Sequence, residues 1–179
     1  MDNFAEYLVR KNETAQDKSK RTLTLIAGIT LTLILATAGI LMAVRPVLFV
    51  VLLLLAFASA YLTYFLVQSM YVEYEYTFTN GELDIDKIVA QKKRTSLLSV
   101  EIKKFDDFGK YSDEMEESED MTVVFASDNI EKHEYYAEFL HDDYGRTRLV
   151  FSPDSKILDY TVNSLMSSVR NKYINNSSD

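Results

Sequence analysis

The sequence of 179 residues contains no cysteine, only two histidines and only five glycines. Without cysteine the chain has neither disulfide bonds nor thiolate metal ligands. Two of the glycines, Gly28 and Gly39, lie in an uncharged segment, and the others are too scattered for a glycine-rich phosphate loop. Histidine and cysteine are thus too few to build a nucleophilic or metal centre. We expect no catalytic site, no metal site and no cofactor.

Charged residues are absent from two long segments near the N-terminus. Residues 23–44 and 47–67 contain no Asp, Glu, Lys, Arg or His, and only Arg45 and Pro46 separate them. At about 1.5 Å of rise per residue, each segment spans about 30 Å as a helix, which is the thickness of the hydrocarbon core of a bilayer. Residues 23–67 are therefore expected to form a transmembrane hairpin of two spans. Its lack of ionisable residues argues against a proton relay or an ion pathway.

The basic residues that flank these spans predict the topology. Lys18, Lys20 and Arg21 precede the first span, whereas Arg45 alone occupies the turn. Because cytoplasmic flanks are enriched in Lys and Arg, the N-terminus is expected in the cytoplasm. Two spans return the chain to the same side. The sequence thus predicts a multi-pass protein of the cell membrane with both termini cytoplasmic.

Small residues recur at steps of three and four along both predicted spans. Such strips allow helix backbones to approach closely in a membrane. The short turn makes the two helices antiparallel neighbours, so we expect the strips to face each other. They consist of Gly28, Thr32, Ala36 and Gly39 in the first span and Ala56, Ala60 and Thr63 in the second.

Residues 1–22 form a polar segment before the first span. Phe4, Tyr7 and Leu8 follow the i, i+3, i+4 spacing of a helix face, which predicts a short amphipathic helix. Such a helix is either a lead-in to the first span that docks on the protein, or an element that lies at the membrane interface.

A soluble domain is expected over residues 71–179. Apolar and polar residues alternate from Tyr71, with Tyr74, Tyr76 and Phe78 predicted to face inward and the intervening Glu and Thr residues to face water. Asn80 and Gly81 are a strong hairpin signal that joins this strand to the next. Further extended segments bring the expected total to about seven antiparallel strands. They cover residues 95–102, 104–111, 121–126, 133–141 and 146–151.

A single amphipathic helix is expected at the C-terminus, over about residues 153–173. Ser152 is a suitable N-cap and Pro153 suits the first helical position. Apolar residues then form one stripe, which predicts a helix with one buried face. The stripe consists of Leu158, Val162, Leu165, Met166, Val169 and Tyr173.

Four short segments carry a family resemblance. Residues 4–9, 74–85, 93–102 and 149–154 read FAEYLV, YEYTFTNGELDI, KRTSLLSVEI and LVFSPD. With these segments and this order of elements, the chain resembles the bacterial pleckstrin-homology-like (PH-like) domain and a group of small two-span proteins from Gram-positive bacteria. The resemblance implies an α+β membrane protein. Its transmembrane hairpin would precede a partly open barrel or sandwich of about seven antiparallel strands, closed by a C-terminal helix.

The lipid-binding site of phosphoinositide-binding relatives is not matched. Their first hairpin turn is long and basic, whereas here it is Asn80 and Gly81 followed by Glu82, which offers a phosphate nothing to bind. Basic residues occur instead in two later groups. These either form one juxtamembrane patch that binds anionic lipid or are solvated turn residues. They are Lys92, Lys93, Arg94, Lys103 and Lys104.

The preferred hypothesis for function is a non-catalytic integral membrane protein. The hairpin would anchor its PH-like domain to the lipid bilayer, and this domain would bind another protein or assemble into a homo-oligomer. The net charge of −8 argues against binding to nucleic acid. The alternative is a module that senses anionic lipid through the basic patch. A remote alternative is a metal-dependent enzyme that uses His141, Asp142 and Asp143.

Overall fold

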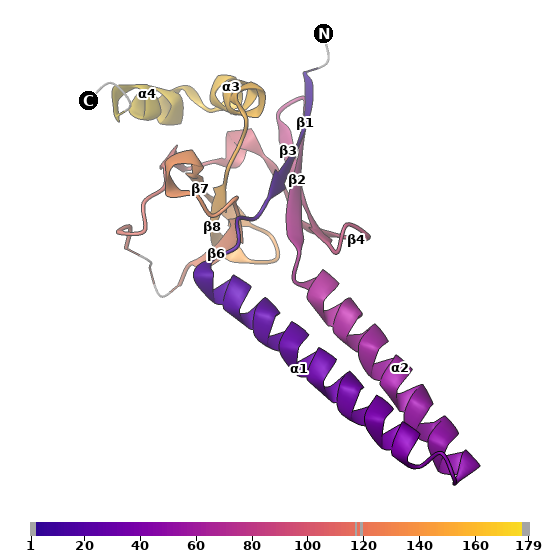
Figure 1. Cartoon of the computed structure of the whole chain (residues 1–179). Helices are drawn as coiled ribbons and strands as arrows, with labels where there is room; N and C mark the ends of the chain where they lie inside the picture. Colours follow the sequence, from indigo (N-terminus) through magenta and orange to yellow (C-terminus); the bar gives the residue numbers. More distant parts are fainter. Residues whose placement is uncertain (1–2, 117, 119, 177–179) are drawn as a thin grey trace. The chain divides into compact units, whose positions relative to one another are not determined.

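The computed structural model describes residues 3–116, 118 and 120–176. The first two residues of the predicted segment 1–22 and the last three of the predicted domain 71–179 lie outside them. The chain forms two compact units. One consists of Glu13–Tyr71, and the other combines Met1–Asn12 with Val72–Asp179. The first is a helical hairpin and the second is a β-rich domain (Figure 1).

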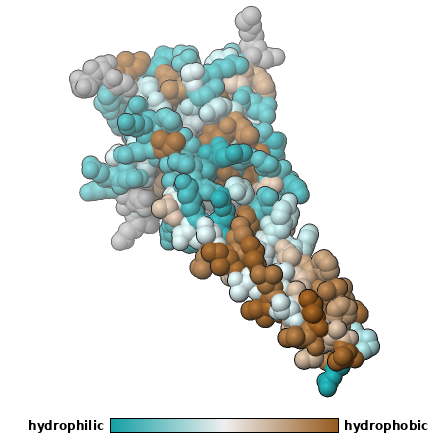
Figure 2. All heavy atoms as spheres, viewed as in Figure 1, coloured by the Kyte–Doolittle hydropathy of each residue, from teal (hydrophilic) through white to brown (hydrophobic). Residues whose placement is uncertain are grey.

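Two antiparallel helices make up the hairpin, α1 (Ala15–Leu41) and α2 (Pro46–Ser69). A capping box begins α1: the Thr14 side chain accepts from the Asp17 amide at 3.1 Å, and the Asp17 carboxylate accepts from the Thr14 amide at 3.3 Å. Both helices are long and apolar enough to cross a membrane. Figure 2 shows hydrophobic residues over most of their visible surface. The first helix ends at Leu41, so residues 42–44 of the predicted span belong to the turn.

Small side chains bring the two helices together. A Cβ atom at Gly28 would lie 2.1 Å from the Thr63 Oγ1 atom, so only glycine permits this approach. The Thr32 and Ser59 hydroxyl oxygens lie 3.2 Å apart, within hydrogen-bond distance across the two helices. Ala56 is buried and Ala36 is half-buried along the same seam. At Gly39 the approach is looser, because an added Cβ would lie 3.4 Å from the Leu52 Cβ atom.

The first sheet of the domain has the strand order β1-β2-β3-β4, and every pair is antiparallel. A tight turn at Asn80 and Gly81 joins β2 to β3, and both residues have the positive φ angles, 52° and 98°, that such a turn requires. The strands are β1 (Phe4–Arg10), β2 (Val72–Thr79), β3 (Glu82–Val89) and β4 (Lys93–Glu101).

The predicted N-terminal helix is wrong, because Phe4–Arg10 form strand β1. Its backbone pairs with β2 along the whole strand, and Ala5 and Val9 are buried while Phe4 and Leu8 are exposed. The period is therefore two rather than 3.6. A helix of this length has little stability of its own, whereas pairing with β2 satisfies the backbone and buries the alternate side chains.

The second sheet has the order β5-β7-β8-β6. Strand β8 lies between β7 and β6. It pairs antiparallel with β7 and parallel with β6. The described residues thus contain eight strands, one more than predicted, and one pair is parallel. The strands are β5 (Asp107–Lys110), β6 (Thr122–Ala126), β7 (Tyr135–His141) and β8 (Gly145–Phe151), with 3₁₀ turns η1 (Ile102–Lys104) and η2 (Glu131–His133).

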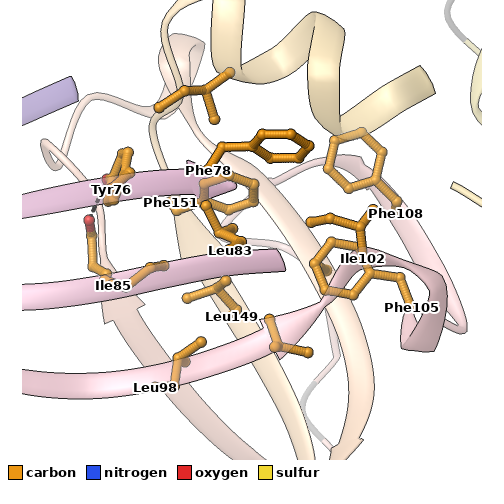
Figure 3. Close-up of a cluster of buried hydrophobic side chains, with 14 of the residues drawn as sticks. Tyr76, Phe78, Leu83, Ile85, Leu98, Ile102, Phe105, Phe108, Leu149 and Phe151 are labelled. Atoms are coloured by element: carbon orange, nitrogen blue, oxygen red, sulfur yellow. Dashed lines mark hydrogen bonds between the residues drawn. The ribbon is translucent and has the colours of Figure 1, made fainter. Parts of the chain in front are cut away.

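The core of the domain lies between the two sheets. Figure 3 shows that its side chains come from both, with Phe78 and Leu83 from the first sheet close to Phe151 and Leu149 from the second. The Tyr76 hydroxyl links the sheets, since it donates to the Ala126 carbonyl and accepts from the Ser152 amide at 3.1 Å.

Two C-terminal helices replace the single predicted one. They are α3 (Ser155–Ser164) and α4 (Ser167–Asn176), and the chain is extended at Leu165 between them, with ψ at 149°. Asp154 caps α3 in place of Ser152, by accepting from the Ile157 amide at 2.9 Å. The break changes the buried face. Ile157 and Thr161 are buried in α3, whereas Met166 is 46% exposed.

Candidate functional site

The helical hairpin is inserted between two paired strands of the domain. Only residues 11–14 separate β1 from α1, and only residues 70–71 separate α2 from β2. In the β1–β2 register Arg10 lies opposite Glu73, so both connections enter the sheet at the same end. We call this the basal end. It also contains the β3–β4 turn, because Val72 pairs with Val89 and Val89 with Lys93.

Ion pairs on one face of the sheet occupy the basal end. The Arg10 guanidinium lies 2.9 Å from a Glu73 carboxylate oxygen. Arg94 pairs with Glu75 and lies 3.9 Å from the Asp86 carboxylate. Glu73 and Glu75 are only 6% and 7% exposed, although alternation predicted that they face water. Arg10 on the adjacent strand β1 and Arg94 on β4, two strands away, account for this difference, because they pair with the two carboxylates.

Glu75 is the titratable group of this face whose environment is most unusual. Burial raises its pKa above the ordinary value of 4.5, and a hydrogen bond with the Glu6 side chain raises it further. Attraction to Arg94 lowers the pKa but does not reverse these effects. The folded domain thus holds the Glu75 proton more tightly than an exposed carboxyl group would.

The five basic residues predicted to bind lipid do not form one patch. Lys92 and Lys93 lie in and beside the β3–β4 turn at the basal end, and Arg94 is paired with Glu75. Lys103 and Lys104 lie in η1, beyond the other end of β4. Strand β4 has nine residues, so about 30 Å of extended chain separates the two groups. The strand that the sequence predicted between the two groups, β4, thus places them at its opposite ends.

The candidate metal ligands lie in the β7–β8 hairpin. His141 Nδ1 accepts a hydrogen bond from the Asp143 amide at 3.1 Å, and its ring stacks on Tyr144 at 4.8 Å. Nearby is a polar hollow of about 80 Å³ whose lining includes Glu82, Lys104, His141 and Asp142. Within the described part of the chain, no three His, Cys, Asp or Glu side chains are placed to hold a metal ion. The tight turn between β7 and β8 accounts for the contacts of His141 with Asp143 and Tyr144.

A partly buried polar network that sequence reasoning missed joins the second sheet to the first. The Ser152 hydroxyl donates to Asp128 at 2.7 Å, and His133 Nδ1 lies 3.0 Å from the other oxygen of that carboxylate. The Ser152 amide donates to the Tyr76 hydroxyl. Burial raises the pKa of Tyr76 well above its ordinary value, so this hydroxyl keeps its proton. Alternation around Tyr76 signalled its burial, but nothing in the sequence signalled its partners.

A second missed network covers the outer face of the second sheet. Arg148 donates to Glu138 at 2.9 and 2.6 Å, and its guanidinium lies 5.9 Å from the Tyr136 ring. Burial and the Asp107 carboxylate raise the pKa of Tyr136 to about 12. These groups satisfy one another, so the network stabilises the sheet and offers no open ligand position.

Comparison with known families decides the identity of the fold. Residues 1–171 match a family model described as "Bacterial PH-like domain (DUF6106)". The chain belongs to this family. The predicted family resemblance and the α+β fold class are thereby confirmed. No curated protein and no solved structure matches the chain.

The PH-like domain exposes an apolar edge at β1. This strand ends its sheet, so one side of its backbone has no neighbouring strand among the described residues. Phe4 and Leu8 are each 51% exposed on it, and Glu6 and Arg10 share their face. The edge of β4, by contrast, begins with the basic residues Lys93 and Arg94, which discourage strand pairing.

Proposed function

We propose that this chain is a non-catalytic integral membrane protein whose PH-like domain binds a protein or a second copy of itself at the cytoplasmic surface. The observation that carries the proposal is the insertion of the hairpin between β1 and β2. The connectors, residues 11–14 and 70–71, span at most about 14 and 7 Å when extended. A domain held at two points by such short connectors meets its partners at the membrane.

The binding surface in this proposal is the free edge of β1. An exposed strand edge accepts an extended segment of another chain through backbone hydrogen bonds, and alternate side chains provide specificity. Phe4 and Leu8 supply apolar contact, since each is half exposed. Glu6 and Arg10 lie on the same face, where Arg10 pairs with Glu73 and Glu6 with Glu75, so Phe4 and Leu8 supply the contacts that remain available.

Photo-crosslinking of the full chain in native membranes tests this surface. A photoreactive residue at Leu8 should give a reproducible covalent adduct, and the mass of the adduct distinguishes a second copy from another protein. Leu140 is the matched control, because it is 70% exposed but lies on the second sheet. The substitution Phe4→Glu should remove the adduct formed from Leu8. Equal labelling from both positions, or none from Leu8, would contradict the proposal.

Binding of anionic lipid by the domain is the second candidate function. It is supported by Lys92 and Lys93, which are exposed at the end of the sheet where the hairpin connects. Each basic residue near an anionic surface contributes about 1 kcal/mol. Hydrogen exchange of the full chain in nanodiscs tests it. Anionic lipid should slow exchange of the β3–β4 turn and leave η1, with Lys103 and Lys104, unchanged; equal exchange in neutral and anionic lipid would rule it out.

A further inference from the structure

An apolar groove runs between α1 and α2 within the hairpin. Its volume is about 340 Å³, within the about 300–1,000 Å³ usual for small-molecule sites. Its lining combines the small residues Gly28 and Ala60 with the large apolar residues Leu25, Leu33 and Tyr64. The hollow arises because small residues on the seam leave space that the larger neighbours do not fill.

The two threonine hydroxyls in the groove are satisfied within their own helices. Thr32 donates to the Gly28 carbonyl at 2.8 Å, and Thr63 donates to the Ser59 carbonyl at 2.8 Å. An occupant therefore needs to supply no hydrogen bond to these threonines, and almost all of the lining surface is apolar. Hydrocarbon is the chemistry that fits such a groove.

Two basic residues continue the groove face of α1 toward its N-terminus. Lys18 and Arg21 precede Leu25 by seven and four residues, which places them on the same helix face. Arg21 Nη1 donates to the Tyr71 hydroxyl at 2.8 Å and to Glu13 at 2.5 Å. The guanidinium also lies 5.3 Å from the centre of the Tyr71 ring. The Arg21 guanidinium thus bridges Glu13, which precedes α1, and Tyr71, which follows α2.

We propose that the groove holds one acyl chain of an anionic phospholipid whose phosphate contacts Lys18 and Arg21. This inference rests on the proposed function in one respect, because the hairpin must lie in the membrane. Charge favours a lipid over a second copy of the chain. Because Arg21 is already paired with Glu13, the charge that an anionic headgroup would neutralise at this end is that of Lys18, whereas a parallel copy in the groove would bring a second Lys18 beside the first.

Native mass spectrometry of the detergent-purified full chain tests the groove. The chain is titrated with phosphatidylglycerol or phosphatidylcholine of equal chain length. Ala60→Trp fills the groove and should lower the bound fraction of phosphatidylglycerol to less than about half, because the acyl chain loses its packing contacts. Ala58→Trp is the control, since it adds the same bulk on the opposite, exposed face of α2.

The same titration tests the headgroup contact. Lys18→Gln should lower the preference for phosphatidylglycerol over phosphatidylcholine about fivefold. Lys20→Gln, which lies on the opposite face of α1, should change it less than twofold. Equal lipid binding by the Ala60→Trp and Ala58→Trp variants would overturn the inference, as would equal preference in both Lys variants. A dimer that only Ala60→Trp dissociates would assign the groove to a second copy.

Failure of the proposed function gives a different result. If the hairpin does not anchor the protein, alkaline carbonate will release the wild-type chain from membranes. If it anchors the protein but the groove binds no lipid, the chain will stay in the membrane fraction and the lipid titration alone will fail.

Discussion

The hairpin and the PH-like domain are held together in different ways. The hairpin is one continuous segment, and its helices meet through small residues across a short turn. The domain is discontinuous, because β1 pairs with a strand whose partner residues lie more than 60 positions away. Closing so long a connection costs conformational entropy. The hairpin lowers this cost by bringing the two ends of the connection together, so we infer that it takes the place of a turn between β1 and β2.

Removal of β1 is expected to have the largest effect on this arrangement. A fragment of residues 72–176 lacks β1 and exposes the side of β2 that β1 covers, together with the core that Ala5 and Val9 complete. We expect it to be unfolded or to lose several of the about 5–15 kcal/mol that stabilise a typical domain. Urea unfolding followed by circular dichroism measures this loss.

The control joins residues 3–12 to residues 72–176 through a short Gly-Ser linker in place of the hairpin. The Lys11 amide donates to the Val72 carbonyl at 3.2 Å, so a linker of a few residues is long enough. This domain should fold and unfold cooperatively. If the fragment without β1 is equally stable, β1 contributes nothing to the free energy of unfolding. The domain would then consist energetically of residues 72–176 alone.

Tyr76→Phe tests the contact between the two sheets in the linked domain. The substitution removes the hydroxyl that the Ala126 carbonyl and the Ser152 amide share, and both backbone groups lose a buried partner. We expect a loss of about 3 kcal/mol in the free energy of unfolding. Tyr7→Phe is the control, because Tyr7 is 38% exposed; it should change stability by less than about 0.5 kcal/mol. Equal losses in both variants would contradict a special role for Tyr76.

The hairpin offers a smaller, local test. Gly28→Ala places a Cβ atom against Thr63, and forced repacking of this kind costs about 2 kcal/mol. Because the chain has no cysteine, Thr32→Cys and Ser59→Cys report the approach of the helices through disulfide formation. Gly28→Ala should slow that reaction in the full chain, and Gly39→Ala, with its looser contact, should not. A similar slowing by both variants would show that the seam is uniform.

The same comparison explains what the sequence could predict. Local signals located the two apolar helices, the small residues of their seam and the Asn80–Gly81 turn. The strand β1 was missed because its partner is distant and because Ala5 is a weak apolar signal. The break at Leu165 depends on packing that a helical stripe does not reveal. At the candidate site, the sequence predicted a strand between Arg94 and Lys103, but the ion pair between Arg94 and Glu75 depends on side-chain contacts that the sequence does not reveal.

Glu75→Gln is expected to have the smallest effect, and the effect depends on pH. The folded state raises the pKa of Glu75, so above the ordinary value of 4.5 the folded domain retains a proton that the unfolded chain releases. Stability contributed by this group is therefore present below that value and decreases as pH rises toward the folded pKa. Glutamine removes this dependence. The loss of the pair with Arg94 costs little, because Arg94 is 59% exposed.

Urea unfolding of the linked domain between about pH 4 and 7 measures the difference. The Glu75→Gln variant should gain stability relative to the wild type as pH rises across this window. Glu6→Gln removes the neighbouring carboxyl while keeping Glu75, so it should reduce the pH dependence without abolishing it. Parallel pH profiles for all three proteins would show that the unfolded chain holds Glu75 in an equivalent environment. Glu73 and Glu75 would then act only as ion-pair partners of Arg10 and Arg94. Protonation of Glu75 would not change the stability of the domain in this pH range.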